Sequence, residues 1–281
     1  MDLRLLRYFV AVVEERHFGR AAVRLRIAQP SLSRAIQLLE RDLGSRLLER
    51  SAAGVATTAA GKALYDGART MLAQAAQLRA QVSTAGGPPT LTVGSLAGVV
   101  EHAGAALVSA FRERHPDVVV RVRESDFADP GCGLRAGLAD VAVTLAPFDT
   151  SGLRVRVLRS DPVAVVLRAD DPLAGRASLA TDDLACRTWF RFPEDTDTLW
   201  SDFWSGTRDG PVVRTAHECL QAVRWNGAVG LIPTGHDLPD GLVAAPLIDH
   251  PPCQLVLAWK DEPPLELVRS LVAVAATLTW Q

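Results

Sequence analysis

The sequence is poor in cysteine: only four occur in 281 residues, at positions 132, 186, 219 and 253. No two of them stand in a C-x-x-C motif, which excludes the usual zinc and dithiol signatures. Two alternatives stay open for these residues, buried reduced thiols and a redox-sensing pair. The six histidines are scattered, so we expect no metal and no cofactor.

Long hydrophobic runs are also missing. No stretch reaches the roughly 18 to 20 apolar residues of a membrane span. Charges at Asp2 and Arg4 interrupt the start of the chain too early for a secretory signal. We therefore expect a cytoplasmic protein with no membrane partner.

The chain has little net charge, −2, but its charged residues are unevenly distributed. Residues 1–85 carry 13 basic and 7 acidic side chains, whereas residues 86–281 carry 17 basic and 25 acidic ones. Only Lys62 and Lys260 are lysines, so arginine supplies nearly all positive charge. The split of +6 against −8 predicts a basic module that meets a polyanion and an acidic module with another task.

Apolar spacing predicts three short helices at the start. The first carries a stripe at positions 6, 9, 10 and 13, the second runs from Phe18 to about Arg26, and the third begins at Gln29-Pro30 and stops at Gly44. Small residues Ala21 and Ala22 allow a close approach between helices. This pattern is typical of a helix-turn-helix, whose second helix enters the major groove of DNA.

The third helix has a polar face opposite its leucines. Arginine can donate two hydrogen bonds to guanine, glutamine pairs with adenine, and serine reaches phosphate or base edges. A solvated face with no ligand is the alternative from composition alone. Together with flanking residues, the candidate DNA-binding set is Gln29, Pro30, Ser31, Ser33, Arg34, Gln37, Arg41, Arg46 and Arg50.

Four ordered motifs within residues 9–50 carry a family resemblance: FVAVVEE at 9–15, FGRAA at 18–22, QPSLSR at 29–34 and LExxLGxxLLER at 39–50. The segment resembles the N-terminal winged helix-turn-helix domain of LysR-type transcriptional regulators. It departs from the family in two ways. Ala28 stands where a Ser or Thr usually caps the recognition helix, and the wing at 51–58 is nearly uncharged. We therefore expect weak wing contacts, with Arg34, Arg46 and Arg50 dominating.

A long helix is predicted from 58 to 85, where no proline occurs. Its apolar residues repeat at spacings of 4 and 3, as in a coiled coil about 40 Å long. The alternative is a core-packing stripe, although no core for it is evident in the sequence. The resemblance implies pairing of this helix between two subunits, through Leu64, Ala68, Met71, Ala75, Leu78 and Val82.

Beyond Gly86-Gly87-Pro88-Pro89 the pattern changes to short apolar runs that alternate with helical segments. Five such runs are predicted strands: 91–94, 118–122, 141–143, 163–167 and 255–259. One helix with Val99, Ala103, Ala106, Ala110 and Phe111 facing inward lies before His115-Pro116, and another runs from about 264 to 278. Alternating strands and helices predict an α/β fold with largely parallel sheets.

This region also resembles the effector-binding domain of the same family, two Rossmann-like lobes of the periplasmic-binding-protein type II kind. The segments that carry the resemblance are 111–118, 134–143, 171–174 and 227–233. We expect a DNA-binding domain at 1–58, a linker helix at 59–85, a hinge at 86–90 and an effector-binding domain at 91–281. Lobe I would comprise 91–160 and 261–281, and lobe II 161–260.

Ligands of open α/β sheets bind beyond the carboxyl ends of the strands, near helix N-termini. Arg191 is the nearest cation for a carboxylate, with a plain surface arginine as the alternative. His217 is either a ligand contact or a surface histidine. The candidate effector-binding set is Ser95, Leu96, Ser125, Leu145, Ala146, Arg191, Phe192, Thr215 and His217.

An enzyme is the second class considered. The run at 94–98, GSLAG, looks like a nucleophile elbow but does not match G-x-S-x-G, since Val93 lies two residues before Ser95. No P-loop, dinucleotide fingerprint or H-E-x-x-H motif occurs, so no catalytic residue is assigned. We expect a non-enzymatic, sequence-specific regulator that binds promoter DNA as a homodimer or homotetramer. Its effector would be a small molecule such as an organic or aromatic acid, acting through the dimer-dimer angle and DNA bending.

Overall fold

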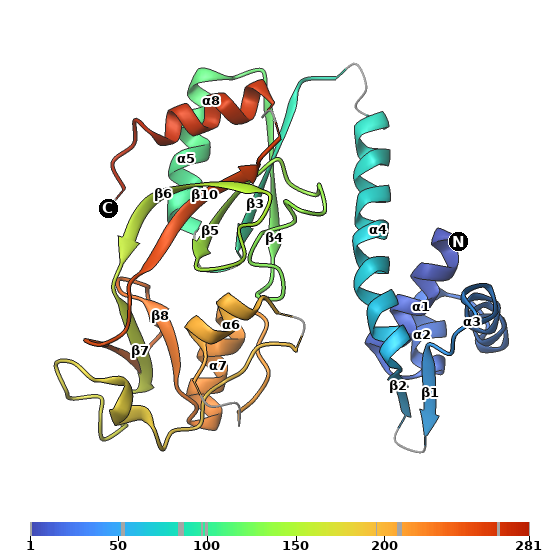
Figure 1. The fold of residues 1–281 in the computed structure, drawn as a ribbon, viewed down its shortest axis with the longest axis horizontal. Helices are drawn as coiled ribbons and strands as arrows, with labels where there is room; N and C mark the ends of the chain where they lie inside the picture. The colour runs from blue at the N-terminus through green and yellow to red at the C-terminus, as the bar shows by residue number, and fades with distance from the viewer. Residues whose placement is uncertain are drawn as a thin grey trace. The chain divides into compact units, whose positions relative to one another are not determined.

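The computed structural model describes residues 2–51, 54–83, 87–96, 98, 101–194, 196–206, 210–262 and 265–280 (Figure 1). The chain divides into two compact units, residues 1–86 and 87–281. No helix within those described ranges is long and apolar enough to cross a bilayer.

The first unit contains three short helices, a hairpin and a long helix. Their bounds are α1 Leu3–Glu15, α2 Phe18–Leu25, α3 Gln29–Leu43, β1 Leu48–Ser51, β2 Gly54–Thr57 and α4 Ala59–Ser83. The two strands pair antiparallel and form the wing. The expected tri-helical head and long helix are confirmed, while residues 52–53 of the wing tip and 84–86 of the hinge lie outside the described part.

Helix boundaries follow from the capping residues. The Asp2 carboxylate accepts a hydrogen bond from the Arg4 N–H and starts α1. Helix α3 begins at Ala28 without a side-chain cap, as expected, and has Pro30 in its first turn. Gly44 ends α3 in a left-handed conformation, φ 65°, which glycine adopts without steric cost.

The core of the first unit gathers the apolar stripes of all three short helices. Its fully buried residues include Leu6, Phe9, Val12, Ala21, Ala22, Leu32, Ile36 and Leu39. Burial of side chains of this size stabilises the head by about 1.5–3 kcal/mol each before entropy is counted.

The first half of α4 joins this core, which agrees with the alternative of a core-packing stripe and not with a coiled-coil seam at these positions. Ala68 is buried in the core cluster of the head, and Leu64, Tyr65 and Leu72 pack against that cluster. The assignment of Leu64 and Ala68 to the dimer seam is therefore corrected. They face the protein's own head, because α4 packs along α1.

A close approach at Gly61 fixes α4 against Leu47, the residue that precedes β1. A Cβ at position 61 would lie 2.0 Å from the Leu47 carbonyl oxygen, which is backbone and cannot move aside. We expect Gly61→Ala to destabilise the head by about 1–3 kcal/mol, seen as a lower midpoint in thermal unfolding followed by circular dichroism.

The matched control for Gly61→Ala is Gly67→Ala on the same helix, where an added Cβ meets open space. Alanine there removes the helix cost of glycine, so stability should rise by about 0.5–1 kcal/mol. Equal effects of the two substitutions would show that the contact at Leu47 is not rigid.

The second unit begins with a five-stranded sheet in the order β4-β3-β5-β10-β6. The strands are β3 Thr90–Leu96, β4 Val119–Ser125, β5 Val141–Ala146, β6 Leu153–Asp161 and β10 Cys253–Lys260. Helices α5 Glu101–Arg114 and α8 Glu266–Ala275 contact each other. One link between them is a 2.6 Å hydrogen bond that joins His115 Nε2, just beyond α5, to Ser270 Oγ. This is lobe I.

Lobe II is built on a three-stranded sheet in the order β8-β7-β9. Its elements are β7 Val163–Arg168, the 3₁₀ helix η1 Thr181–Leu184, α6 Thr198–Trp204, α7 Ala216–Asn226, β8 Gly230–Pro233 and β9 Leu242–Pro246. Isolated parallel bridges at Leu179, Trp189 and Arg191 extend this lobe's strand pairing.

Three details of the second unit differ from the expectation. Strand β10 lies between β5 and β6, so the chain returns to lobe I before Cys253 and not near Lys260. The sheets are mixed, since only β3 pairs in parallel with its neighbours among the named strands. Strands β6, β8 and β9 and helix α6 were not predicted. Strands β8 and β9 and helix α6 are short, whereas the alternation LRVRV at 153–157 in β6 is a strand signal that was missed. Val99 and position 264 of the predicted helices lie outside the described residues.

Candidate DNA interface and ligand cavity

One face of α3 is free of the head core and carries the predicted DNA-reading side chains. Six predicted residues of this helix are exposed and one, Ser33, is half-buried: Gln29, Pro30, Ser31, Ser33, Arg34, Gln37 and Arg41. Arg46, beyond the end of the helix, is exposed as well. The backbone of Arg50 lies in β1, and its side chain is outside the described part of the structure.

The arginines of α3 carry uncompensated charge. Arg34 Nε and Arg41 Nε each lie 3.4 Å from a carbonyl oxygen one turn back in the same helix, those of Pro30 and Gln37. Neither guanidinium forms an ion pair with a described carboxylate. Most of their N–H groups are therefore open to an external acceptor such as a base edge or a phosphate.

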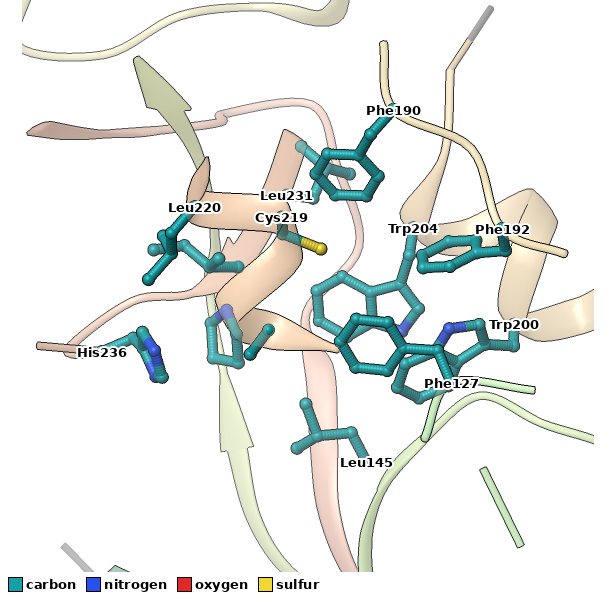
Figure 2. A pocket seen from close by; sticks show the side chains of 13 residues that line it. Phe127, Leu145, Phe190, Phe192, Trp200, Trp204, Cys219, Leu220, Leu231 and His236 are labelled. Atoms are coloured by element: carbon teal, nitrogen blue, oxygen red, sulfur yellow. The ribbon is translucent and has the colours of Figure 1, made fainter. Parts of the chain in front are cut away.

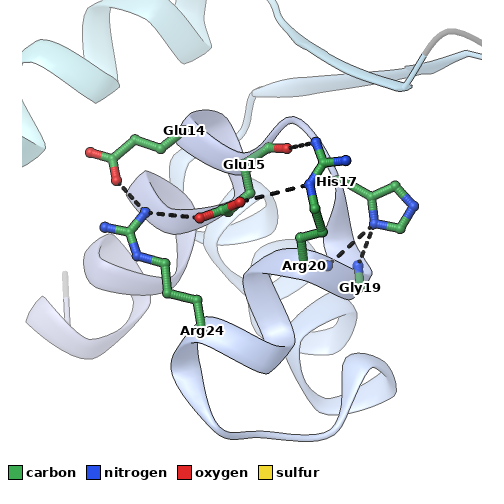
Figure 3. Close-up of polar contacts among 6 residues, drawn as sticks. All are labelled: Glu14, Glu15, His17, Gly19, Arg20 and Arg24. Atoms are coloured by element: carbon green, nitrogen blue, oxygen red, sulfur yellow. Dashed lines mark hydrogen bonds and ion pairs between the residues drawn. The ribbon is translucent and has the colours of Figure 1, made fainter.

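The arginines of α2, in contrast, are tied to α1 (Figure 3). Arg24 Nη1 lies 2.6 Å from Glu14 Oε2 and 3.4 Å from Glu15 Oε1, and Arg20 pairs with Glu15. The hydrogen bond that Arg24 donates to the Glu14 carboxylate raises the pKa of Arg24 above its usual value. These pairs hold α2 against α1 and neutralise its cations.

His17 sets the start of α2. Its Nδ1 accepts hydrogen bonds from the N–H groups of Gly19, at 3.0 Å, and Arg20, at 3.3 Å (Figure 3). This histidine therefore has an N-cap role, which satisfies two otherwise unpaired donors at the helix start.

Glu40 connects α3 to β1, the first strand of the wing. Its Oε1 accepts hydrogen bonds from the N–H groups of Leu47, at 2.8 Å, and Leu48, at 3.2 Å. On the other side, the Thr58 hydroxyl donates to the Arg46 carbonyl oxygen over 2.7 Å. The segment carrying Arg46 is thus held at both ends, close to the end of α3.

In the second half of α4, three predicted seam residues are exposed: Met71, Leu78 and Val82. Ala75 is half-buried. Large apolar side chains at such spacing on an exposed helix face are typical of an interaction surface. We name Met71, Leu78 and Val82 the α4 apolar strip.

An aromatic cavity lies where lobe II meets lobe I. Phe127 and Leu145 contribute from lobe I, and the rest come from lobe II (Figure 2). The space between the lining side chains is about 450 Å³ with its open mouth included, and about 40 Å³ of it admits the centre of a water molecule. The full lining is Phe127, Leu145, Phe190, Phe192, Trp200, Trp204, Ala216, Cys219, Leu220, Leu231, Ile232, Pro233 and His236. The water-accessible volume is smaller than the roughly 300–1,000 Å³ of an open small-molecule site, so a ligand would have to displace lining side chains.

Of the nine predicted effector residues, only Leu145 and Phe192 line this cavity. Leu96 is fully buried in the core of lobe I, and Ser95 lines a separate groove between α5 and β4. Ser125 and Ala146 are half-buried at strand ends. The position of a residue at the carboxyl end of a strand predicts the edge of the sheet where it lies, but not the direction of its side chain. This explains why most of the predicted residues do not line the cavity.

The polar candidates from lobe II also lie away from the cavity lining. Arg191 is exposed and its Nε donates to the Gly210 carbonyl oxygen at 3.0 Å. Thr215 caps α7 by accepting from the Glu218 N–H. His217 is exposed, with its Nε2 3.5 Å from Gln221 Nε2. Arg191 is thus outside the lining of this cavity, and its pairing with a ligand carboxylate stays a prediction.

The aromatic residues of the cavity were not predicted, although their concentration in the sequence could have indicated them. Three of the six tryptophans and three of the eight phenylalanines fall within residues 189–204. In a chain with 6% aromatic residues, such a concentration indicates a shared cluster. The rings of Phe127, Phe190, Phe192, Trp200 and Trp204 form that cluster, with neighbouring centroids 5.5–6.3 Å apart.

The four cysteines are free thiols, and three are buried. Burial raises the pKa of Cys132 and of Cys253 to about 12 and that of Cys219 well above its usual value. The thiolate is the reactive species, so these three groups are chemically inert in the folded state. This favours the reading of buried reduced thiols over a redox pair.

Thiol labelling tests that reading. In the native protein Ellman's reagent should react promptly with Cys186 alone, the exposed cysteine, and in denaturant with all four. Cys186→Ser should leave no promptly reactive thiol. Prompt labelling of a second native cysteine, or a disulfide after peroxide treatment, would contradict this assignment.

Family models match both units of the chain. One, described as "Bacterial regulatory helix-turn-helix protein, lysR family", covers residues 3–62, and "LysR substrate binding domain" covers residues 85–279. Among relatives, the transcriptional regulator BudR of Raoultella terrigena is 34% identical over 74% of this chain and 73% of its own length. ShiR of Corynebacterium glutamicum is 32% identical over 90% of this chain and 88% of its own.

Solved full-length structures agree on the fold. CbnR, a LysR family regulator, superposes with a TM-score of 0.63 at 22% identity, covering all of both chains. Full-length BenM gives a TM-score of 0.55 at 26% identity over 98% of this chain and 96% of its own. Both units, the relatives and the fold point the same way: the chain belongs to the LysR family of DNA-binding bacterial transcriptional regulators, non-enzymatic proteins with a C-terminal effector-binding domain.

Proposed function

We propose that this regulator binds an inverted-repeat operator as a homodimer or dimer of dimers. In this scheme α3 reads the major groove and the α4 apolar strip pairs two subunits. The observation that carries the proposal is the exposed face of α3. Arg34 and Arg41 have no ion-pair partner among the described carboxylates, whereas Arg20 and Arg24 are neutralised. Such a division of charge fits a helix that must offer guanidinium groups to base edges.

The second part of the proposal is that a small molecule in the aromatic cavity changes the angle between the lobes. That change would reach the dimer-dimer geometry and the bending of DNA. Support comes from contacts that cross between lobes beside the cavity. The Asp126 carboxylate lies 3.1 Å from Arg214 Nη1, and the Phe127 N–H donates to the Arg214 carbonyl oxygen at 2.7 Å.

Helix α6, which supplies two cavity tryptophans, is tied to both lobes. The Asp197 carboxylate accepts from the Trp200 N–H, at 3.0 Å, and from the Asp149 N–H of lobe I, at 2.8 Å. A ligand that displaces Trp200 would therefore also move a contact with lobe I. Differential contacts of this kind are what allow a ligand to shift an equilibrium between two arrangements.

A gel-shift titration on the DNA upstream of the protein's own reading frame tests the first part. We expect retardation at nanomolar protein and competition by the same unlabelled fragment but not by random DNA. Absence of binding at low salt to this fragment and to every fragment of a genomic library would refute operator binding.

A further inference from the structure

Two tryptophans that line the aromatic cavity have buried hydrogen-bond donors without a partner in the described part of the chain. Trp200 is 2% exposed and Trp204 3%, and neither indole N–H has an acceptor among the described residues. The two rings lie side by side with centroids 5.5 Å apart, and Figure 2 shows both indoles beside Phe127 and Phe192. A buried donor without a partner costs about 1–3 kcal/mol, so an acceptor at this place would be stabilising.

The remaining surface of the cavity is apolar and carries no fixed positive charge. None of its thirteen lining residues is a lysine or arginine. The thiol of Cys219 is held neutral by its raised pKa, and Figure 2 shows His236 across the cavity from the indoles. A carboxylate buried here would lose its hydration without gaining a cation.

Negative charge lies at the start of α6, the helix that carries both indoles. The Asp197 carboxylate caps α6 and accepts from the backbone N–H of Trp200. An anionic ligand would be repelled by this group as well as poorly solvated. A neutral acceptor such as a ketone, ester or amide oxygen meets neither penalty and still accepts from an indole N–H.

From these observations we infer that the effector is an uncharged aromatic or alicyclic molecule with a carbonyl-type acceptor. Its ring would contact Phe127, Phe190 and Phe192, and its oxygen would accept from the indole N–H of Trp200 or Trp204. This inference rests on the proposed function of the cavity as the effector site. It replaces the expectation of an organic or aromatic acid.

The test compares three probes that share a benzene ring: acetophenone, which is neutral with an acceptor, benzoate, which is charged, and ethylbenzene, which has no acceptor. Binding to the full chain is followed by its tryptophan fluorescence. We expect acetophenone to bind at least tenfold more tightly than either other probe. Equal or tighter binding of benzoate would overturn the inference, and so would equal binding of ethylbenzene.

Two variants then identify which indole N–H donates to the ligand. Trp200→Phe and Trp204→Phe keep an aromatic ring but remove a donor, and the one that meets the ligand should raise the dissociation constant for acetophenone about fivefold. Trp225→Phe is the matched control, because Trp225 is 77% exposed on α7 and outside the cavity lining. Unchanged affinity in both cavity variants would also overturn the inference. The wild-type comparison of probes decides it even if a variant fails to fold.

Gel shifts on the same preparations keep the two claims separate. A protein that retards operator DNA but prefers benzoate contradicts the ligand class alone. A protein that retards no DNA contradicts the proposed function, whatever it binds in the cavity.

Discussion

Leu78→Glu should lower the affinity for a two-half-site operator by about 100-fold or more, and leave the affinity for a single half-site nearly unchanged. Leu78 is 60% exposed in the single chain, at the centre of the α4 apolar strip. A charge there opposes burial between two helices. Loss of pairing removes the effective concentration that a tethered second head provides, which is worth about 10²–10⁴ in avidity.

Light scattering after size exclusion and fluorescence anisotropy on the two DNA lengths measure this effect. Ile248→Glu is the control, since Ile248 is 73% exposed but belongs to lobe II. It should keep both the oligomeric state and the operator affinity. A Leu78→Glu protein of unchanged mass and affinity would place the subunit interface elsewhere.

Arg34→Ala has the second largest expected effect. Removing a guanidinium that reads a guanine should cost about 1–3 kcal/mol, or roughly 5- to 150-fold in affinity for the cognate site. Binding to random DNA should change little, because a base contact carries sequence information that a phosphate contact does not. The fold should persist, since Arg34 is exposed and bonds only to its own helix.

Arg156→Ala is the matched control for charge, because it removes one exposed arginine from β6 in the other unit. Anisotropy titrations at one salt concentration should give wild-type affinity for it. If Arg34→Ala weakened cognate and random DNA equally, Arg34 would touch only the phosphate backbone.

The head could be predicted closely from the sequence, because its helices bury one stripe each and their ends carry local signals. Positions 32, 36 and 39 are buried as their spacing indicates, and Gly44 stops α3. The same spacing misled at Leu64 and Ala68. A heptad pattern shows that a helix face is covered, but not whether its partner is another subunit or the protein's own α1.

The cavity could not be predicted with similar success. Its lining comes from five separate segments, which only the packing of α6, α7 and β8 brings together. The rule for strand ends led to Leu145, which lines the cavity, but to few of its other residues. Side chains such as Phe127 and Trp200 meet through tertiary contacts, and no local period encodes that.

The most direct test of operator recognition by α3 is to select genomic DNA fragments with the full-length protein and to sequence them. We expect enrichment of fragments that share a two-fold inverted repeat. That enrichment should be lost with Arg34→Ala but not with Arg156→Ala. Recovery of no common sequence by the wild-type protein, or the same sequence by the Arg34→Ala variant, would contradict operator recognition by α3.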